Sequence, residues 1–321
     1  MKYLEEKKKE LEAYLPPLTR ETDFDAFWEE TKALSAARPL DMELVETDYP
    51  ASHLRLYDVT YSGFDGAAIH GWYMEPVWDA APGKFPCLIN YHGFNGDRGM
   101  PSDFFLWTMA GMAVLTVDCR EQGGRTGSSS SYGSTGIVKN VTSKGIMDPH
   151  EYYYRAVYMD CLRALDLACC LPRVDVSRLV IHGISQGGGI GTAVAGLDSR
   201  PAAALLDVPS CANLERRVLG EHGAFSAVTD YLRKYPDHTD TALRTLSYFD
   251  TMNLADRITC PVYASVALKD DVCPAQCFYA AYNRISAPKS IEVYPFNTHD
   301  GARHVHWQKK LQFLNDLGIL D

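Results

Sequence analysis

The segment LVIHGISQGGG, residues 179–189, contains a serine with a glycine two positions before it and another two positions after it. Gly183, Ser185 and Gly187 form the pattern G-x-S-x-G, which follows an apolar run and precedes a segment rich in Ala and Gly. A strand that turns sharply into a helix exposes such a serine hydroxyl at a strained bend. Side chains two positions away would collide with the turn, so glycine is needed there. The pattern therefore predicts that Ser185 is a nucleophile.

A nucleophilic serine needs a base to take its proton and an acid to orient that base. In hydrolases built on this turn they follow in the order Ser, Asp or Glu, His, each after a late strand. His299 follows the apolar run at 290–296, and Asp270 and Asp271 follow the run at 261–268. We expect His299 to be the base, but spacing does not choose between Asp270 and Asp271.

Other polar residues near these positions are weaker candidates. Asp300 adjoins His299 and would have to fold back to orient it. His304 and His306 fall at the start of the last predicted helix, and side chains two positions apart on a helix diverge, so we expect no metal site there. His92 follows a predicted strand and is expected to shape the neighbouring loop.

That loop, YHGFNGDRG at 91–99, is expected to help stabilise a negatively charged oxygen. In such hydrolases one backbone N–H comes from this loop and another from the residue after the nucleophile. We therefore predict the N–H groups of Phe94 and Gln186 as the oxyanion hole. Each donor of this kind typically stabilises the transition state by about 3 kcal/mol.

The elements that position these residues alternate between strands and helices. Continuous apolar runs predict strands buried on both faces, as in a parallel sheet, at 87–91, 112–118, 179–183, 203–208, 261–268 and 290–296. Helical patterns separate them at about 149–170, 185–195 and 305–317. Alternating strands and helices predict an α/β fold with a doubly wound, mostly parallel sheet.

The N-terminal part follows a different pattern. Helices are expected at 2–14 and 23–34, and strands at 53–63 and 68–76 flank the turn dipeptide Asp65-Gly66 as an antiparallel hairpin. We expect one domain over 1–321, with a helical extension at 1–40 and a small helical cap insertion at about 211–253. Residues 121–147 are rich in Gly and Ser, and a loop this long is usually functional or ordered by a partner.

Composition excludes several classes of protein. The 321 residues are 46% hydrophobic and 22% charged, which is typical of a globular protein. A net charge of −10 disfavours nucleic acid and anionic membranes as partners. The nine cysteines include no C-x-x-C pair, which indicates reduced thiols rather than a zinc ribbon. The N-terminus lacks the apolar core of a signal peptide, so we expect a cytoplasmic protein without metal or cofactor.

Several motifs resemble one known family, the acetyl xylan esterases and cephalosporin C deacetylases of carbohydrate esterase family seven. The similar segments extend from about residue 50 to 315. They are YHGFNGDRG at 91–99, DCREQG at 118–123, GISQGGG at 183–189, RTLSYFDTMNLADRI at 244–258, DDVCPAQCFYAAYN at 270–283 and YPFNTHDG at 294–301.

The resemblance implies an α/β-hydrolase fold and a Ser-Asp-His triad. The family places the acid three residues before a Cys-Pro pair, which here is Asp270 ahead of Cys273-Pro274. It also implies acetylated xylo-oligosaccharides and cephalosporin-type acetates as substrates, short acyl chains, and a homo-oligomer, a hexamer. A peptidase, a thioesterase or a non-catalytic binding protein on the same fold are the alternatives.

Three positions depart from the family pattern. The usual Arg-Gly-Gln reads Arg-Glu-Gln, with Glu121 in place of glycine. The family usually has a tyrosine in the oxyanion loop where this chain has Phe94. Phenylalanine keeps the backbone N–H but lacks the hydroxyl. The usual His-Glu reads His299-Asp300. None of these changes removes a reacting group.

Overall fold

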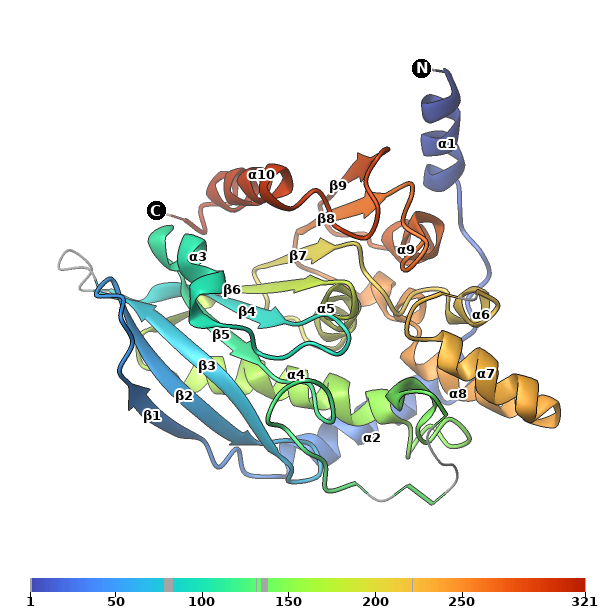
Figure 1. The fold of residues 1–321 in the computed structure, drawn as a ribbon, viewed down its shortest axis with the longest axis horizontal. Coiled ribbons are helices and arrows are strands. Elements are labelled where there is room, and N and C mark those ends of the chain that lie inside the picture. The colour runs from blue at the N-terminus through green and yellow to red at the C-terminus, as the bar shows by residue number, and fades with distance from the viewer. Residues whose placement is uncertain (1, 78–82, 131, 134–137, 221, 321) are drawn as a thin grey trace.

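The computed structural model describes residues 2–77, 83–130, 132–133, 138–220 and 222–320, and its centre is a twisted sheet (Figure 1). Within these residues the sheet has nine strands in the order β1-β2-β3-β5-β4-β6-β7-β8-β9. The strands are β1 Glu43–Thr47, β2 Leu54–Ser62, β3 Ala68–Pro76, β4 Phe85–Tyr91, β5 Ala113–Val117, β6 Val174–Ile184, β7 Ala203–Asp207, β8 Val262–Ala267 and β9 Lys289–Tyr294.

The sheet joins an antiparallel part to a parallel part. The strands β1, β2 and β3 run antiparallel to one another, and β3 runs antiparallel to β5. From β5 through β4, β6, β7 and β8 to β9, all neighbours are parallel. The β2–β3 hairpin turns at Asp65-Gly66, as predicted, and Gly66 has a φ of 89°, which glycine adopts without strain.

Helices cover the sheet and extend beyond it. They are α1 Lys2–Glu12, α2 Phe24–Ala36, α3 Phe105–Met109, α4 Tyr153–Cys170, α5 Gln186–Leu197, α6 Leu214–Val218, α7 Ser226–Lys234, α8 Thr239–Phe249, α9 Ala275–Tyr282 and α10 Arg303–Asp316. Short 3-10 helices lie at Pro101–Phe104, Val141–Ser143, Pro236–His238, Thr251–Asn253 and Ala255–Arg257. No helix in the described ranges combines the length and apolar character needed to cross a bilayer.

Each face of the sheet has its own apolar core. On one face, Trp107 of α3 and Leu314 of α10 pack against Leu88 and Val114 of the central strands. On the other face, α2, α4, α5 and the helices after β7 pack against the alternate residues, such as Ile89. Figure 1 shows the same arrangement, with α3 and α10 on one side and α4 and α5 on the other. Because both faces are covered, most residues of the central strands β4, β5 and β7 are apolar and buried.

The expected helical insertion lies between β7 and β8, where α6, α7 and α8 occur. Of the Gly/Ser-rich segment 121–147, the structure describes all but 131 and 134–137, and Val141–Ser143 forms a 3-10 turn. Three elements were not predicted: β1, α3 and α9. The first is a largely exposed edge strand and the second has only five residues, so neither carries a strong periodic signal.

Candidate active site

Ser185 lies in the sharp turn between β6 and α5, which we call the nucleophile elbow. Its backbone has a φ of 59° and a ψ of −119°, a strained conformation for a residue with a side chain. A Cβ at Gly187 would lie 1.8 Å from Tyr91 O, and one at Gly183 would lie 2.2 Å from the backbone of Gly187. The absence of a side chain at these two glycines therefore allows the turn to close. The N–H of Ser185 donates to Asp207 O at 2.9 Å.

The structure brings Ser185, His299 and Asp270 into one row of hydrogen bonds. His299 Nε2 lies 2.8 Å from Ser185 Oγ, and His299 Nδ1 lies 2.7 Å from Asp270 Oδ2. The other carboxylate oxygen of Asp270 accepts from the N–H groups of Val272 and Cys273. The Asp270 side chain is 0% exposed and that of His299 is 27% exposed. A buried acid, an oriented imidazole and a hydroxyl open to solvent are the arrangement that activates a nucleophile.

The rival residues lie elsewhere. Asp271 is exposed and makes no hydrogen bond to His299 in the described part of the chain. Asp300 accepts from the side chain of Asn297 and from the N–H of Ala302 within its own loop. His304 is exposed, whereas His306 is buried and stacks on Tyr263.

A cavity of about 470 Å³ opens over the serine. Its lining includes Phe94, Ile184, Ser185, Val272 and His299. The N–H of Phe94 donates no hydrogen bond within the described residues, and that of Gln186 begins α5, where no intrahelical acceptor exists. Both predicted oxyanion donors therefore belong to segments beside Ser185 and keep unused N–H groups.

Gln122, whose role the sequence did not reveal, connects these two segments. Its Oε1 accepts from Asn95 N at 2.8 Å, next to Phe94 in the oxyanion loop. Its Nε2 donates to Gln186 Oε1 at 3.0 Å and to Tyr153 Oη at 2.9 Å. The amide group thus holds the oxyanion loop at a fixed place relative to the elbow. The sequence feature that could have indicated this role is the R-x-Q motif, because its glutamine lies just after the end of a buried strand.

The arginine of the same motif, Arg120, holds the start of the segment that follows β5. Arg120 is fully buried and forms two hydrogen bonds to each of the carboxylates of Asp160 and Asp65. Glu121, which follows, has a φ of 56°, the left-handed region that favours glycine. Its carboxylate binds Lys144 Nζ at 2.7 Å, and this ion pair helps offset the strain. The backbone therefore keeps a glycine-like shape although glycine is absent.

His92 shapes the oxyanion loop, as expected. Its Nε2 accepts from the N–H of Cys119 at 2.8 Å, so the ring proton is on Nδ1, which donates to Gly93 O at 2.7 Å. Both ring nitrogens are occupied, and His92 is not free to act as a base toward Ser185.

A cysteine side chain, that of Cys273, lies beside the nucleophile. Cys273 Sγ is 4.0 Å from Ser185 Oγ, and the side chain is buried. Burial raises the pKa of the Cys273 thiol, and the nearby Arg217 only partly opposes this effect. The thiol is therefore protonated at neutral pH and does not compete with Ser185 as a nucleophile.

A buried polar cluster supports the elbow from the side of α10. Lys310 Nζ donates to Asp207 Oδ2 at 2.6 Å and lies 3.0 Å from His182 Nε2. His182 Nδ1 lies 2.8 Å from Asn90 Oδ1, which fixes the tautomer that accepts from Lys310. Burial, together with Lys310, lowers the pKa of His182 to about 3. Burial alone would raise the pKa of Asp207, but Lys310 and His306 hold it well below its usual range.

Replacing Lys310 with methionine is expected to destabilise the fold by about 3–5 kcal/mol, because it removes the ammonium group that lies 2.6 Å from the buried Asp207 carboxylate and leaves His306 as its ion-pair partner. The free energy of unfolding, measured by urea titration, checks this. Lys309→Met is the matched control, because Lys309 is 42% exposed and pairs with Glu292, so its loss costs about 1 kcal/mol or less. An equal loss of unfolding free energy in the two variants would show that the buried Lys310–Asp207 pair stabilises the fold no more than an exposed pair does.

No cluster of three or more His, Cys, Asp or Glu side chains that could hold a metal ion occurs in the described ranges. The groups around Ser185 are a hydroxyl, an imidazole, a carboxylate and unpaired backbone N–H groups. This set supports attack on a carbonyl carbon through a covalent intermediate.

Comparisons with known proteins agree with this chemistry. A family model described as acetyl xylan esterase (AXE1) matches residues 1–317. The solved structure of an acetyl xylan esterase from Paenibacillus sp. R4 is 41% identical, with a TM-score of 0.92 over 96% of this chain and 98% of that one. The acetyl esterase Axe7A of Xylanibacter ruminicola is 28% identical over 89% of this chain, and the chain spans 65% of that relative's length.

A more distant solved structure is similar to this chain in fold only. The α/β hydrolase GrgF from Penicillium sp. sh18 has a TM-score of 0.58 and 19% identity, over 81% of this chain and 98% of that one.

Proposed function

The chain belongs to the acetyl xylan esterase family, and we propose that it is a serine esterase that removes acetyl groups through Ser185, His299 and Asp270. The observation that carries the proposal is the row of two hydrogen bonds, 2.8 and 2.7 Å long, that ends on Ser185 Oγ in an open cavity. The cavity volume lies within the usual range for small-molecule sites.

In the proposed reaction, Ser185 Oγ attacks the ester carbonyl carbon while His299 Nε2 takes the hydroxyl proton. The N–H groups of Phe94 and Gln186 stabilise the negative charge that forms on the carbonyl oxygen. His299 then gives its proton to the leaving alcohol oxygen as the carbon–oxygen bond breaks, which leaves an acetyl-enzyme. Water, deprotonated by His299, attacks this ester, and acetate leaves as the proton returns to Ser185 Oγ. Asp270 stabilises the imidazolium in both steps.

We propose acetylated xylo-oligosaccharides and small acetate esters of the cephalosporin C type as substrates. Support comes from the names of the similar proteins, which are an acetyl esterase and acetyl xylan esterases. Phe94, Ile184 and Val272 provide apolar surface near the serine, which suits a sugar ring or a methyl group.

A panel of 4-nitrophenyl esters from acetate to octanoate, an acetylated xylo-oligosaccharide and an aminopeptidase substrate tests the proposal. We expect the highest kcat/KM for acetate among the 4-nitrophenyl esters, release of acetate from the oligosaccharide, and no amide hydrolysis. Higher kcat/KM for octanoate, or cleavage of the peptide substrate, would favour the thioesterase-like or peptidase alternatives instead.

We also propose that the chain is cytoplasmic and assembles into a homo-oligomer. In favour of assembly, α1 projects away from the rest of the molecule (Figure 1) and leaves Tyr3 largely exposed. Leu15, just after it, and Phe296 are also exposed. A second copy of the chain would cover such apolar side chains.

A further inference from the structure

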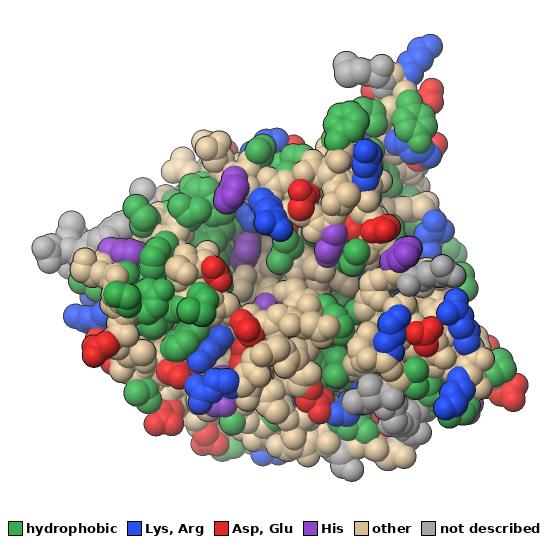
Figure 2. Space-filling view, in the orientation of Figure 1, with side chains coloured by type: hydrophobic (Ala, Val, Ile, Leu, Met, Phe, Trp, Pro, Cys, Tyr) green, Lys and Arg blue, Asp and Glu red, His purple; other side chains and the backbone are tan. Residues whose placement is uncertain are grey.

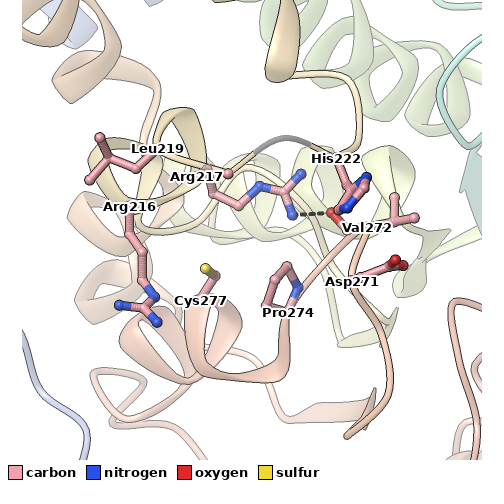
Figure 3. A pocket seen from close by; sticks show the side chains of 9 residues that line it. Arg216, Arg217, Leu219, His222, Asp271, Val272, Pro274 and Cys277 are labelled. Carbon is pink, nitrogen blue, oxygen red and sulfur yellow. Dashed lines mark hydrogen bonds between the residues drawn. The ribbon is translucent and has the colours of Figure 1, made fainter. Parts of the chain in front are cut away.

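A second cavity, of about 320 Å³, lies next to the active-site cavity. Figure 3 shows its lining, which comes from α6, the residues that follow α6, and the segment from Asp271 to Cys277. Val272 lines both cavities, and the consecutive residues His222 and Gly223 line one each. The segment directly after the proposed catalytic acid, Asp270, therefore forms part of the wall between the two cavities.

The buried cation of this cavity lacks an anionic partner. Arg217 is 6% exposed and its guanidinium donates to Val272 O, as the dashed line in Figure 3 shows. Among the described residues, the ionisable side chains that act on Arg217 are the thiols of Cys273, Cys277 and Cys211, which are neutral when protonated. Burying a charged group without an opposite charge is unfavourable, and an anion in the cavity would relieve this cost.

Two more basic side chains line the same space. They are Arg216 and His222, and both are exposed. The acidic residue of the lining is Asp271, which in Figure 3 lies at the opposite end of the cavity from Arg216. In Figure 2, Lys and Arg side chains gather over α6 and α7, although the whole chain has a net charge of −10. Among its described lining residues, the cavity thus has two arginines and one acidic side chain, on a protein that is acidic overall.

We propose that this cavity is a subsite for a carboxylate on the alcohol portion of the substrate, as in an acetylated sugar acid. The inference rests on the proposed acetyl esterase function, because a short acyl group leaves the alcohol portion to extend beyond the active-site cavity. Guanidinium groups bind carboxylate and phosphate alike. A single negative charge suits the site better than a dianionic phosphate, because Asp271 adds repulsion at one end.

The test compares two acetate esters that differ in one group: acetylated methyl glucuronoside and its carboxamide. We expect the wild-type protein to show a higher kcat/KM for the carboxylate, mainly through a lower KM. Arg216→Gln should lower the ratio of the two kcat/KM values about tenfold, the loss of one charge-assisted contact. Arg216→Lys should restore part of it, and added NaCl should reduce it.

Lys234→Gln is the matched control, since it removes one positive charge from α7, and Lys234 does not line the cavity. It should leave the ratio unchanged. Equal ratios in wild type and Arg216→Gln, or an equal effect of Lys234→Gln, would overturn the subsite and leave the esterase proposal intact. Absence of hydrolysis of both esters and of 4-nitrophenyl acetate would overturn both. An acetylated sugar phosphate that outcompetes the carboxylate would contradict the choice of carboxylate.

Discussion

Replacing Ser185 with alanine is expected to lower kcat for 4-nitrophenyl acetate by about 10⁴-fold or more. Without Oγ no acetyl-enzyme forms, and only direct attack by water, assisted by the oxyanion donors, remains. Stopped-flow and steady-state assays of nitrophenolate release measure the effect. The fold should be retained, because alanine still permits the 2.9 Å hydrogen bond from the backbone N–H at 185 to Asp207 O.

Two controls make the Ser185 result specific. Ser177→Ala changes an exposed serine at the start of β6 and should leave kcat near the wild-type value. An organophosphate should add its mass to Ser185 in the wild-type protein and to nothing in Ser185→Ala. A loss of kcat under tenfold, or labelling of another residue, would remove Ser185 from the mechanism.

Replacing Asp270 with asparagine is expected to lower kcat by about 10⁴-fold near neutral pH, with little change in KM. The amide keeps the size of the side chain, but its NH₂ group can face His299 Nδ1 and favour the tautomer that carries its proton on Nε2. That tautomer cannot accept the proton of Ser185 Oγ, which lies 2.8 Å away. The amide also cannot stabilise an imidazolium as a carboxylate does.

Asp271→Asn is the matched control for this prediction, because it makes the same chemical change one residue away. Asp271 is exposed, whereas Asp270 Oδ2 lies 2.7 Å from His299 Nδ1. The 4-nitrophenyl acetate activity should change little in Asp271→Asn. Comparable losses in both variants would show that neither carboxylate alone orients the base, and that the chosen acid is wrong.

Much of the fold followed from local sequence patterns. The predicted fold class and the family are confirmed by the sheet topology and the comparisons. The hairpin strand β3 has the predicted bounds, and the predicted strands of the parallel part agree within two residues at each end, except that β6 begins at Val174 rather than at 179. Buried parallel strands need apolar side chains on both faces, so they leave a strong signal. The edge strand β1, with the sequence ELVET, is largely exposed, so it does not need apolar side chains and its sequence shows no strand pattern.

The sequence identified some residues of the candidate site more completely than others. The elbow was readable because its glycines are a local steric necessity, as the 1.8 Å approach at Gly187 shows. Residue types and strand order were enough to propose His299. Spacing left Asp270 and Asp271 equivalent, and the family resemblance favoured Asp270. In the structure the N–H groups of Val272 and Cys273 bind one oxygen of Asp270 and leave the other facing the imidazole.

By itself, the sequence determined where the chain turns, which strands are buried and which residue types stand ready to react, because steric and hydrophobic demands act between near neighbours. The tertiary structure alone decided which distant side chains meet. Lys310 reaches Asp207 across 103 positions, and Gln122 reaches Gln186 across 64. It also placed Arg216 and Arg217 beside the segment that follows β8. Such meetings depend on the order of strands in the sheet and on the packing of helices against it, and no local pattern records these.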